Sequence, residues 1–145
     1  MAVNFDTAIR IKRPVEQVFD YVSDPGNFPR WNSAVQAMTA TSGKGERGST
    51  YLMQRDLPAG RASNDLEVIE RERPTRFTIR TTSGPTPFLY RYRFDTEADA
   101  TLVELAADVE LSGLAGALGP VTSRVVKRGV DANFATLKQI LESSG

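Results

Sequence analysis

Four aromatic residues recur at every second position in the middle of the chain, and they offer the clearest material for chemistry. The stripe consists of Phe88, Tyr90, Tyr92 and Phe94. Residues at this spacing share one face of a strand, and two tyrosines on an inward face need partners for their hydroxyl groups. The unperturbed pKa of tyrosine is about 10, so Tyr90 or Tyr92 would act as an acid or hydrogen-bond donor rather than as a base. We predict that the stripe forms a pocket wall, with a fully packed core as the alternative.

Three further side chains are candidates for contact with a ligand. Arg55 shares its parity with Tyr51 and Met53, so on a strand it points inward. There its guanidinium would bind a carboxylate or polarise a carbonyl, unless its head group reaches water instead. Trp31 belongs either to the core or to the mouth of a cavity. Asn133 is the one amide on the apolar face of the last helix, where it either bonds structurally to the sheet or contacts a ligand.

A glycine-rich segment resembles a nucleotide-binding motif in its spacing alone. Residues Gly43–Gly48 match the pattern G-x-G-x-x-G. The mechanism of that motif requires a helix directly after it, because the N-terminus of the helix holds the phosphates. An alternating strand follows here, so we predict a hairpin loop.

Charged residues alternate with apolar ones along the same strands and predict cross-strand pairs on a solvent-exposed face. The residues placed on that face are Glu67, Arg71, Arg80, Arg91, Arg93, Glu104, Asp108 and Glu110. No carboxylate pair suited to acid–base catalysis falls on an inward parity.

The composition removes several functional classes. The 145 residues include no histidine and no cysteine, which excludes Cys/His zinc sites and Ser-His or Cys-His nucleophile pairs. We expect no metal and no cofactor. Lys+Arg and Asp+Glu both number 18, so no overall charge favours nucleic acid. With no apolar run near the ~20 residues of a membrane span and no signal-peptide pattern, we expect a cytoplasmic protein without an integral membrane segment.

The order of hydrophobic periodicities predicts the architecture that positions these side chains. Alternation indicates seven strands, at 3–11, 35–41, 49–56, 62–72, 76–82, 88–94 and 103–111. A short helix at 15–22 and a turn of helix at 27–32 follow the first strand. After a glycine-broken segment at 113–119, a long helix begins near Pro120. Short turns imply antiparallel neighbours, and both sheet and helix need a covered apolar face. We therefore expect one α+β domain over residues 1–145, with a curved sheet wrapped around the last helix.

The long helix presents one continuous apolar face and two valines outside it. Its apolar face includes Val126, Val130 and Asn133 at helical spacing. Val121 and Val125 lie off this face, where they either edge the mouth of a cavity or meet a partner.

The chain resembles the START-like superfamily, also called the Bet v 1-like or SRPBCC superfamily, and in particular its polyketide cyclase/dehydrase-type branch. The residues that carry the resemblance are the strand ending at Ile11, then Pro14–Val22, Asp24-Pro25, Phe28–Asn32, Glu67-Val68, Pro74, Tyr92–Phe94, Thr101–Val103 and the closing helix. The resemblance covers nearly the whole chain and implies the helix-grip fold. It also implies a deep apolar cavity between the sheet and the C-terminal helix. Members bind lipids, sterols, hormones and polyketides, and only some are enzymes.

We therefore expect an internal cavity that binds a small hydrophobic molecule such as a polyketide or lipid. The expected lining residues are Trp31, Tyr51, Met53, Phe77, Phe88, Tyr90, Tyr92, Val126 and Asn133. One alternative is a polyketide aromatase/cyclase that catalyses aldol closure and dehydration, with Tyr90, Tyr92 and Arg55 as candidate catalytic groups. Another is a protein-interaction module with a collapsed cavity. The sequence does not determine the oligomeric state.

Overall fold

The computed structural model describes residues 2–57, 60–111 and 120–144, so the segment expected at 113–119 lies outside the described residues. The elements that it contains follow the predicted order closely. They are β1 (Ala2–Ile11), α1 (Val15–Val22), a 3₁₀ turn η1 (Pro25–Asn27), α2 (Phe28–Trp31), β2 (Val35–Ser42), β3 (Thr50–Leu57), β4 (Gly60–Glu72), β5 (Arg76–Ser83), β6 (Phe88–Glu97), β7 (Ala100–Glu110) and α4 (Pro120–Ser143).

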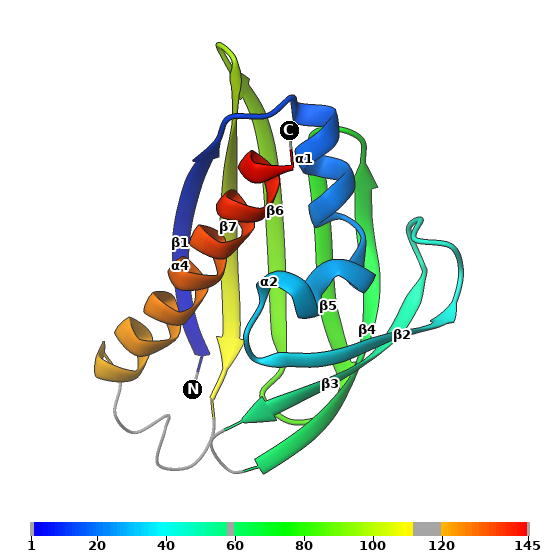
Figure 1. The fold of residues 1–145 in the computed structure, drawn as a ribbon. Helices are drawn as coiled ribbons and strands as arrows, with labels where there is room; N and C mark the ends of the chain where they lie inside the picture. Colours follow the sequence, from blue (N-terminus) through cyan, green and yellow to red (C-terminus); the bar gives the residue numbers. More distant parts are fainter. Residues whose placement is uncertain (1, 58–59, 112–119, 145) are drawn as a thin grey trace.

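The seven described strands form one antiparallel sheet in the order β1-β7-β6-β5-β4-β3-β2 (Figure 1). Strands β2 to β7 each pair with their neighbour in sequence, and the first strand joins the sheet beside the last. The β1–β7 register runs without a break from Ala2 opposite Glu110 to Ile11 opposite Thr101. This topology makes β1 and β2 the two edges of an open sheet and confirms the expected helix-grip arrangement.

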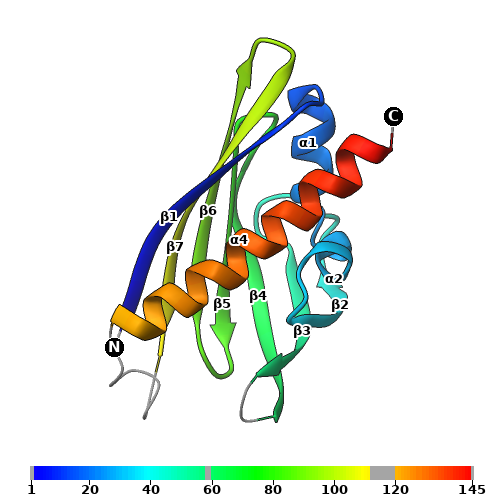
Figure 2. The ribbon, with the colours of Figure 1, turned by 60° about the vertical axis from the view of Figure 1, so that its left-hand side comes forward.

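Helix α4 crosses the inner face of the sheet diagonally, so that a single helix covers an apolar surface made by several strands (Figure 2). Polar contacts fix its position against the edge strand β1. The Thr7 hydroxyl donates to the Asp131 carboxylate, and the Lys138 ammonium donates to the carbonyl oxygen of Arg10 at 2.7 Å. Phe134 and Leu137 point from α4 into the core, where both are almost fully buried.

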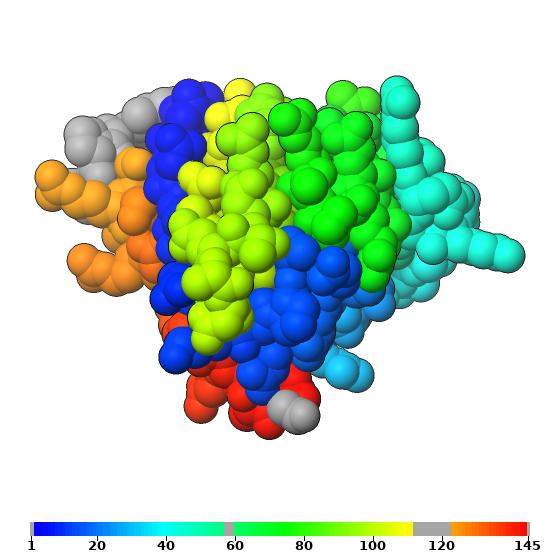
Figure 3. All heavy atoms as spheres, turned by 90° about the horizontal axis from the view of Figure 1, so that it is seen from above, coloured from blue at the N-terminus to red at the C-terminus, as the bar shows by residue number. Residues whose placement is uncertain are grey.

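One end of the space between sheet and α4 is filled by aromatic packing beneath α1. Phe19 of α1 meets Phe94 edge to face with ring centroids 5.1 Å apart, and Phe77 stacks on Tyr92 at 6.0 Å. None of these four side chains is more than 4% exposed. Figure 3 views this end, where α1, the β6–β7 turn and the last turns of α4 pack together. Any room for a ligand must therefore lie toward α2 and the opposite end of the sheet.

A β-bulge in β4 overturns one expectation about the charged face. The register shifts between Val68 and Glu70, so one extra residue inverts the parity of the strand beyond it. Arg71 then pairs opposite the buried Phe77 and stacks over the ring of Phe19 at 5.2 Å. The prediction that Arg71 lies on the solvent-exposed face was wrong, because strict alternation does not anticipate a bulge.

Candidate functional site

A hollow of about 180 Å³ lies between the sheet and α4, beside α2, and we call it the inner hollow. Its walls come from four places: α2 and the connection to β2, the end of β3, the first half of β6, and the middle of α4. The residues that line it are Phe28, Trp31, Asn32, Ser33, Ala34, Val35, Met53, Arg55, Phe88, Tyr90, Tyr92, Val126, Gly129, Val130 and Asn133.

The aromatic stripe of β6 forms the floor of the inner hollow. The rings of Phe88 and Tyr90 lie 4.4 Å apart, and Tyr90 meets Tyr92 edge to face at 6.3 Å. Neither tyrosine hydroxyl has a hydrogen-bond partner among the residues that the structure describes. Burial raises the pKa of Tyr90 to about 12, against the smaller opposing effect of Arg55. Burial likewise raises the pKa of Tyr92 well above its ordinary value. Both groups are therefore neutral donors at physiological pH.

Arg55 is the one charged side chain on the described lining of the inner hollow. Hydrogen bonds along one edge of its guanidinium group hold it in place. Its Nε donates to Oδ1 of the buried Asn64 at 2.9 Å, and its Nη2 donates to the carbonyl oxygens of Pro85 and Thr86 at 2.7 and 2.6 Å. The guanidinium also lies over the ring of Phe88, 5.5 Å from its centroid. Partial burial lowers the pKa of Arg55, yet it stays far above neutrality, so the group is a cation in the wall of an aromatic pocket.

The opposite wall contains the tryptophan and the amide singled out in the sequence. Trp31 is 3% exposed and packs against Phe28 and Phe134, so it serves both the core and the wall. Its Nε1 has no hydrogen-bond partner in the described part of the chain. The Asn133 side chain accepts through Oδ1 from the backbone N–H and the hydroxyl of Ser33 at 3.2 and 3.3 Å. Asn133 thus makes a structural bond, but its partner lies in the α2–β2 connection, and the expected bond to the sheet was wrong.

Two of the expected lining residues lie away from the inner hollow. Phe77 is opposite Tyr92 in the register and belongs to the packed end beneath α1. Tyr51 lies two residues before Met53 in β3, nearer the β2–β3 loop, where its hydroxyl approaches Gly45. Both side chains point inward as their parity requires, but the cavity occupies only part of the inner face. The remaining expected lining residues all lie around the hollow.

The residues that sequence reasoning missed come mostly from the segment between α2 and β2, together with Phe28. Asn32, Ser33 and Ala34 carry no periodic signal, because a chain reversal rather than a regular element brings them to the hollow, and Val35 is the first residue of β2. Val130 was signalled by its helical spacing with Val126 and Asn133. Val125 is 62% exposed on the far side of α4, and the side chain of Val121 lies outside what the structure describes.

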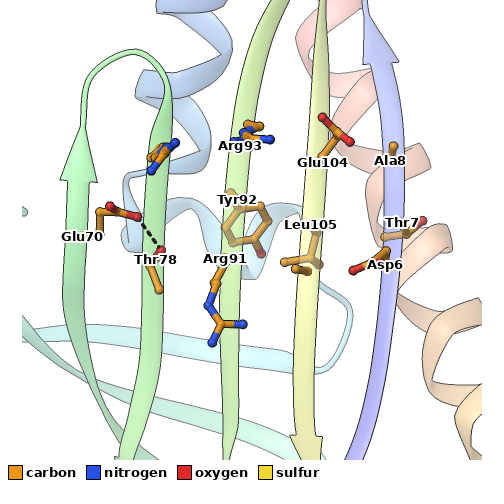
Figure 4. Close-up of a pocket in the computed structure, with 12 residues that line it drawn as sticks. Asp6, Thr7, Ala8, Glu70, Thr78, Arg91, Tyr92, Arg93, Glu104 and Leu105 are labelled. Carbon is orange, nitrogen blue, oxygen red and sulfur yellow. Dashed lines mark hydrogen bonds between the residues drawn. The ribbon is translucent and has the colours of Figure 1, made fainter.

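A second hollow, on the outer face of the sheet, is larger but of a different character (Figure 4). About 680 Å³ in volume, it is open to solvent and bordered by charged side chains that include Arg91, Arg93 and Glu104. Cross-strand pairs such as Arg91 with Asp108, 3.2 Å apart, and Arg80 with Glu67, 3.3 Å apart, follow the predicted pattern. Such a surface does not remove an apolar molecule from water, so we place the candidate site in the inner hollow.

Other features of the sequence find their place outside the inner hollow. The glycine-rich segment forms the β2–β3 loop, and strand β3 follows it, as predicted. Gly43, Gly45 and Gly48 all have positive φ angles that suit a tight turn. Within the described ranges, no group of acidic side chains is arranged to hold a metal ion, and no helix is long and apolar enough to cross a membrane.

Solved structures with the same architecture define the class to which this fold belongs. A START superfamily protein from Mycobacterium smegmatis aligns with a TM-score of 0.83 at 14% identity, over 98% of this chain and 99% of that one. A protein from Thermus thermophilus aligns with the same TM-score of 0.83, at 16% identity over 98% and 99% of the two chains. The di-domain ARO/CYC StfQ of the steffimycin biosynthetic pathway gives a TM-score of 0.78 at 13% identity, over 99% of this chain and 52% of StfQ. These likenesses establish a START-like fold.

The sequence itself narrows the class to a family. The family model described as polyketide cyclase/dehydrase and lipid transport matches residues 2–142, and the chain belongs to that family. No curated protein is similar enough to the sequence to count as a match.

Proposed function

We propose that this protein binds a small apolar molecule in the inner hollow. The observation that carries the proposal is an aromatic-lined space beneath α4 in which the hydroxyls of Tyr90 and Tyr92 have no partner among the described residues. Ligand pockets in proteins combine such apolar walls with a few polar groups that fix orientation. Membership of a polyketide cyclase/dehydrase and lipid transport family supports the same reading.

The size of the hollow supports occupancy over an empty core. Lost packing costs about 24 cal/mol for each Å³ of cavity, so 180 Å³ left empty would cost up to about 4 kcal/mol. That is a large part of the roughly 5–15 kcal/mol that typically stabilises a domain. Water recovers some of this free energy at the polar groups, and an apolar ligand recovers more at the aromatic walls.

Two measurements test the proposal. Native mass spectrometry of the freshly purified protein is expected to show a retained small molecule. Binding of a small single-ring apolar probe is expected to weaken at least tenfold in Tyr90→Ala and Tyr92→Ala. Arg91→Ala and Arg93→Ala are the matched controls, because their side chains lie on the outer face of the same strand, and they are expected to change affinity less than twofold.

Equal losses in the four variants would contradict the site, and no retained molecule together with no probe binding would contradict the function. The latter result would favour a protein-interaction module whose inner hollow holds only water. Circular dichroism of each variant separates loss of binding from loss of the fold.

One observation favours catalysis as a second candidate function. Arg55 and Tyr90 place a cation and a neutral hydroxyl donor on one wall, where they would polarise a carbonyl oxygen during aldol closure of a polyketide. No carboxylate lines the described part of the hollow, so water would have to serve as the base. Turnover of a polyketide mimic that is abolished in Tyr90→Phe or Tyr92→Phe would support an aromatase/cyclase.

A further inference from the structure

The volume of the inner hollow indicates the size of the ligand. A cavity of about 150 Å³ holds one benzene molecule, whereas drug-sized ligands occupy pockets of about 300–1,000 Å³. At about 180 Å³ the inner hollow has room for one six-membered ring and a small substituent. A fatty acyl chain or a folded polyketide of several rings would extend beyond this volume.

The walls that set this volume are tightly packed. The ring centroids of Trp31 and Phe134 lie 6.3 Å apart, and those of Phe134 and Tyr92 lie 6.4 Å apart. Trp31, Tyr92 and Phe134 are each 4% exposed or less. Enlarging the hollow toward α1 would displace these rings from the core, at the free-energy cost that accompanies lost packing.

The side chains on the lining offer donors and few free acceptors. Trp31 Nε1 and Asn133 Nδ2 can only donate, and neither has a partner among the described residues. The two amide oxygens are already in use, since Asn133 Oδ1 accepts from Ser33 and Asn32 Oδ1 accepts from the backbone N–H of Ala34, while the hydroxyls of Tyr90 and Tyr92 are free to donate. A complementary ligand therefore supplies acceptor oxygens.

The charge of Arg55 makes the required acceptor more specific. Its Nε and Nη2 are held by Asn64, Pro85 and Thr86, while Nη1 has no partner in the described part of the chain. No carboxylate of the described residues forms an ion pair with it. A partly buried guanidinium that is already oriented, yet lacks a counter-charge, is suited to bind an anionic oxygen.

We infer that the ligand is a single-ring aromatic carboxylic acid, with its ring against Phe88 and Tyr90 and its carboxylate on Arg55. This inference rests on the proposed function, because it identifies the class of molecule that the same hollow binds. It is narrower than the family description, since the volume of the hollow favours one ring over a lipid or multi-ring product, and the charge of Arg55 favours an anionic ligand over a neutral hydrocarbon.

Calorimetric titration of the full chain tests the inference with three probes. Benzoate is ionised at neutral pH, benzamide has nearly the same shape without the charge, and palmitate carries the same carboxylate on a long chain. Benzoate is expected to bind at least tenfold more tightly than benzamide, because a hydrogen bond to an ionised group is worth roughly ten- to a hundredfold in affinity. Palmitate is expected not to bind.

Two variants locate the charge effect. Arg55→Met retains the length of the side chain and is expected to reduce benzoate affinity about 10- to 100-fold. The loss for benzamide is expected to be several-fold smaller, because its neutral carbonyl oxygen forms only the weaker hydrogen bond. Arg91→Met removes a charge from the outer face and is expected to leave both affinities unchanged. If Arg55→Met fails to fold, the comparison of benzoate with benzamide on the unaltered protein still decides the question.

Equal affinity for benzoate and benzamide, tighter binding of palmitate, or an unchanged benzoate affinity in a folded Arg55→Met protein would each overturn the inference. Binding of a larger apolar probe that depends on Tyr92, without binding of benzoate, would overturn the inference and leave the proposed function standing. Absence of binding by every probe would refute both.

Discussion

Replacing the buried Asn64 tests how the wall of the inner hollow is supported. Asn64 is 1% exposed, and its side chain links three segments. Its Oδ1 accepts from Arg55 at 2.9 Å, and its Nδ2 donates to the carbonyl oxygens of Ser83 and Pro85 at 3.1 and 2.8 Å. Asn64→Ala removes all three hydrogen bonds and leaves polar groups without partners in the interior.

The expected loss of stability follows from the number of hydrogen bonds that Asn64 forms. Each hydrogen bond contributes about 1 kcal/mol net, so Asn64→Ala is expected to lower the free energy of unfolding by about 3 kcal/mol. Asn64→Asp separates the contributions, because a carboxylate still accepts from Arg55 but cannot donate to Ser83 and Pro85. We expect a loss of at least about 2 kcal/mol for that variant at neutral pH, since two carbonyl oxygens then face a carboxylate oxygen.

Urea unfolding provides the assay. Trp31 is the one tryptophan of the chain and is buried beside the inner hollow, so its fluorescence reports loss of the native packing. Ser63→Ala is the matched control, since the neighbouring Ser63 side chain is not buried and forms no hydrogen bond within the described residues. A loss below about 1 kcal/mol in Asn64→Ala, or an equal loss in Ser63→Ala, would refute the reasoning.

Three further predictions concern the backbone and the titrating groups. Gly84→Ala is expected to destabilise the protein at least about 2 kcal/mol more than Gly48→Ala in urea unfolding. The φ angles are similar at +99° and +94°, but a Cβ at Gly84 would clash with the backbone oxygen of Ser63, while Gly48 has open space around it. Equal losses in the two variants would contradict this. The pKa of Asp20 is lowered chiefly by its hydrogen bond to Arg73, and its side chain is about 50% exposed. Asp20→Asn is therefore expected to lower the free energy of unfolding by less than about 1 kcal/mol at neutral pH. The difference in stability between wild type and variant is expected to vanish in strongly acidic solution, where Asp20 is protonated in both the folded and the unfolded state, and a difference that grows in acid would contradict this. Folding raises the pKa of Tyr90 to about 12. This group is therefore expected to leave the stability of the protein unchanged below about pH 10 and to lower it by about 2 kcal/mol as the pH rises toward 12. Tyr90→Phe is expected to flatten that decline in urea unfolding at alkaline pH, and identical alkaline slopes in the two proteins would exclude the pKa shift.

The periodicity of the sequence was sufficient for the order of the elements and for the direction of most side chains. Alternation along β6 placed Tyr90 and Tyr92 on the inner face, and alternation along β3 placed Arg55 there, because the pleat of a strand leaves only two faces. The helical spacing of Val126 and Asn133 identified the face of α4 that covers the hollow in the same way. The same argument failed at Arg71, where the bulge in β4 reverses the parity of the strand.

Only the tertiary structure decided which part of the inner face stays open. Phe77 and Met53 both point inward, yet Phe77 lies beneath the aromatic packing of α1 while Met53 reaches the hollow. The α2–β2 connection reaches the site through a chain reversal that has no periodic signature, and the fixed guanidinium of Arg55 depends on carbonyl oxygens about thirty residues further along the chain. Periodicity describes which way a side chain points relative to its own backbone, whereas the shape and charge of a cavity depend on segments that are distant in sequence and meet only after the sheet has closed around its helix.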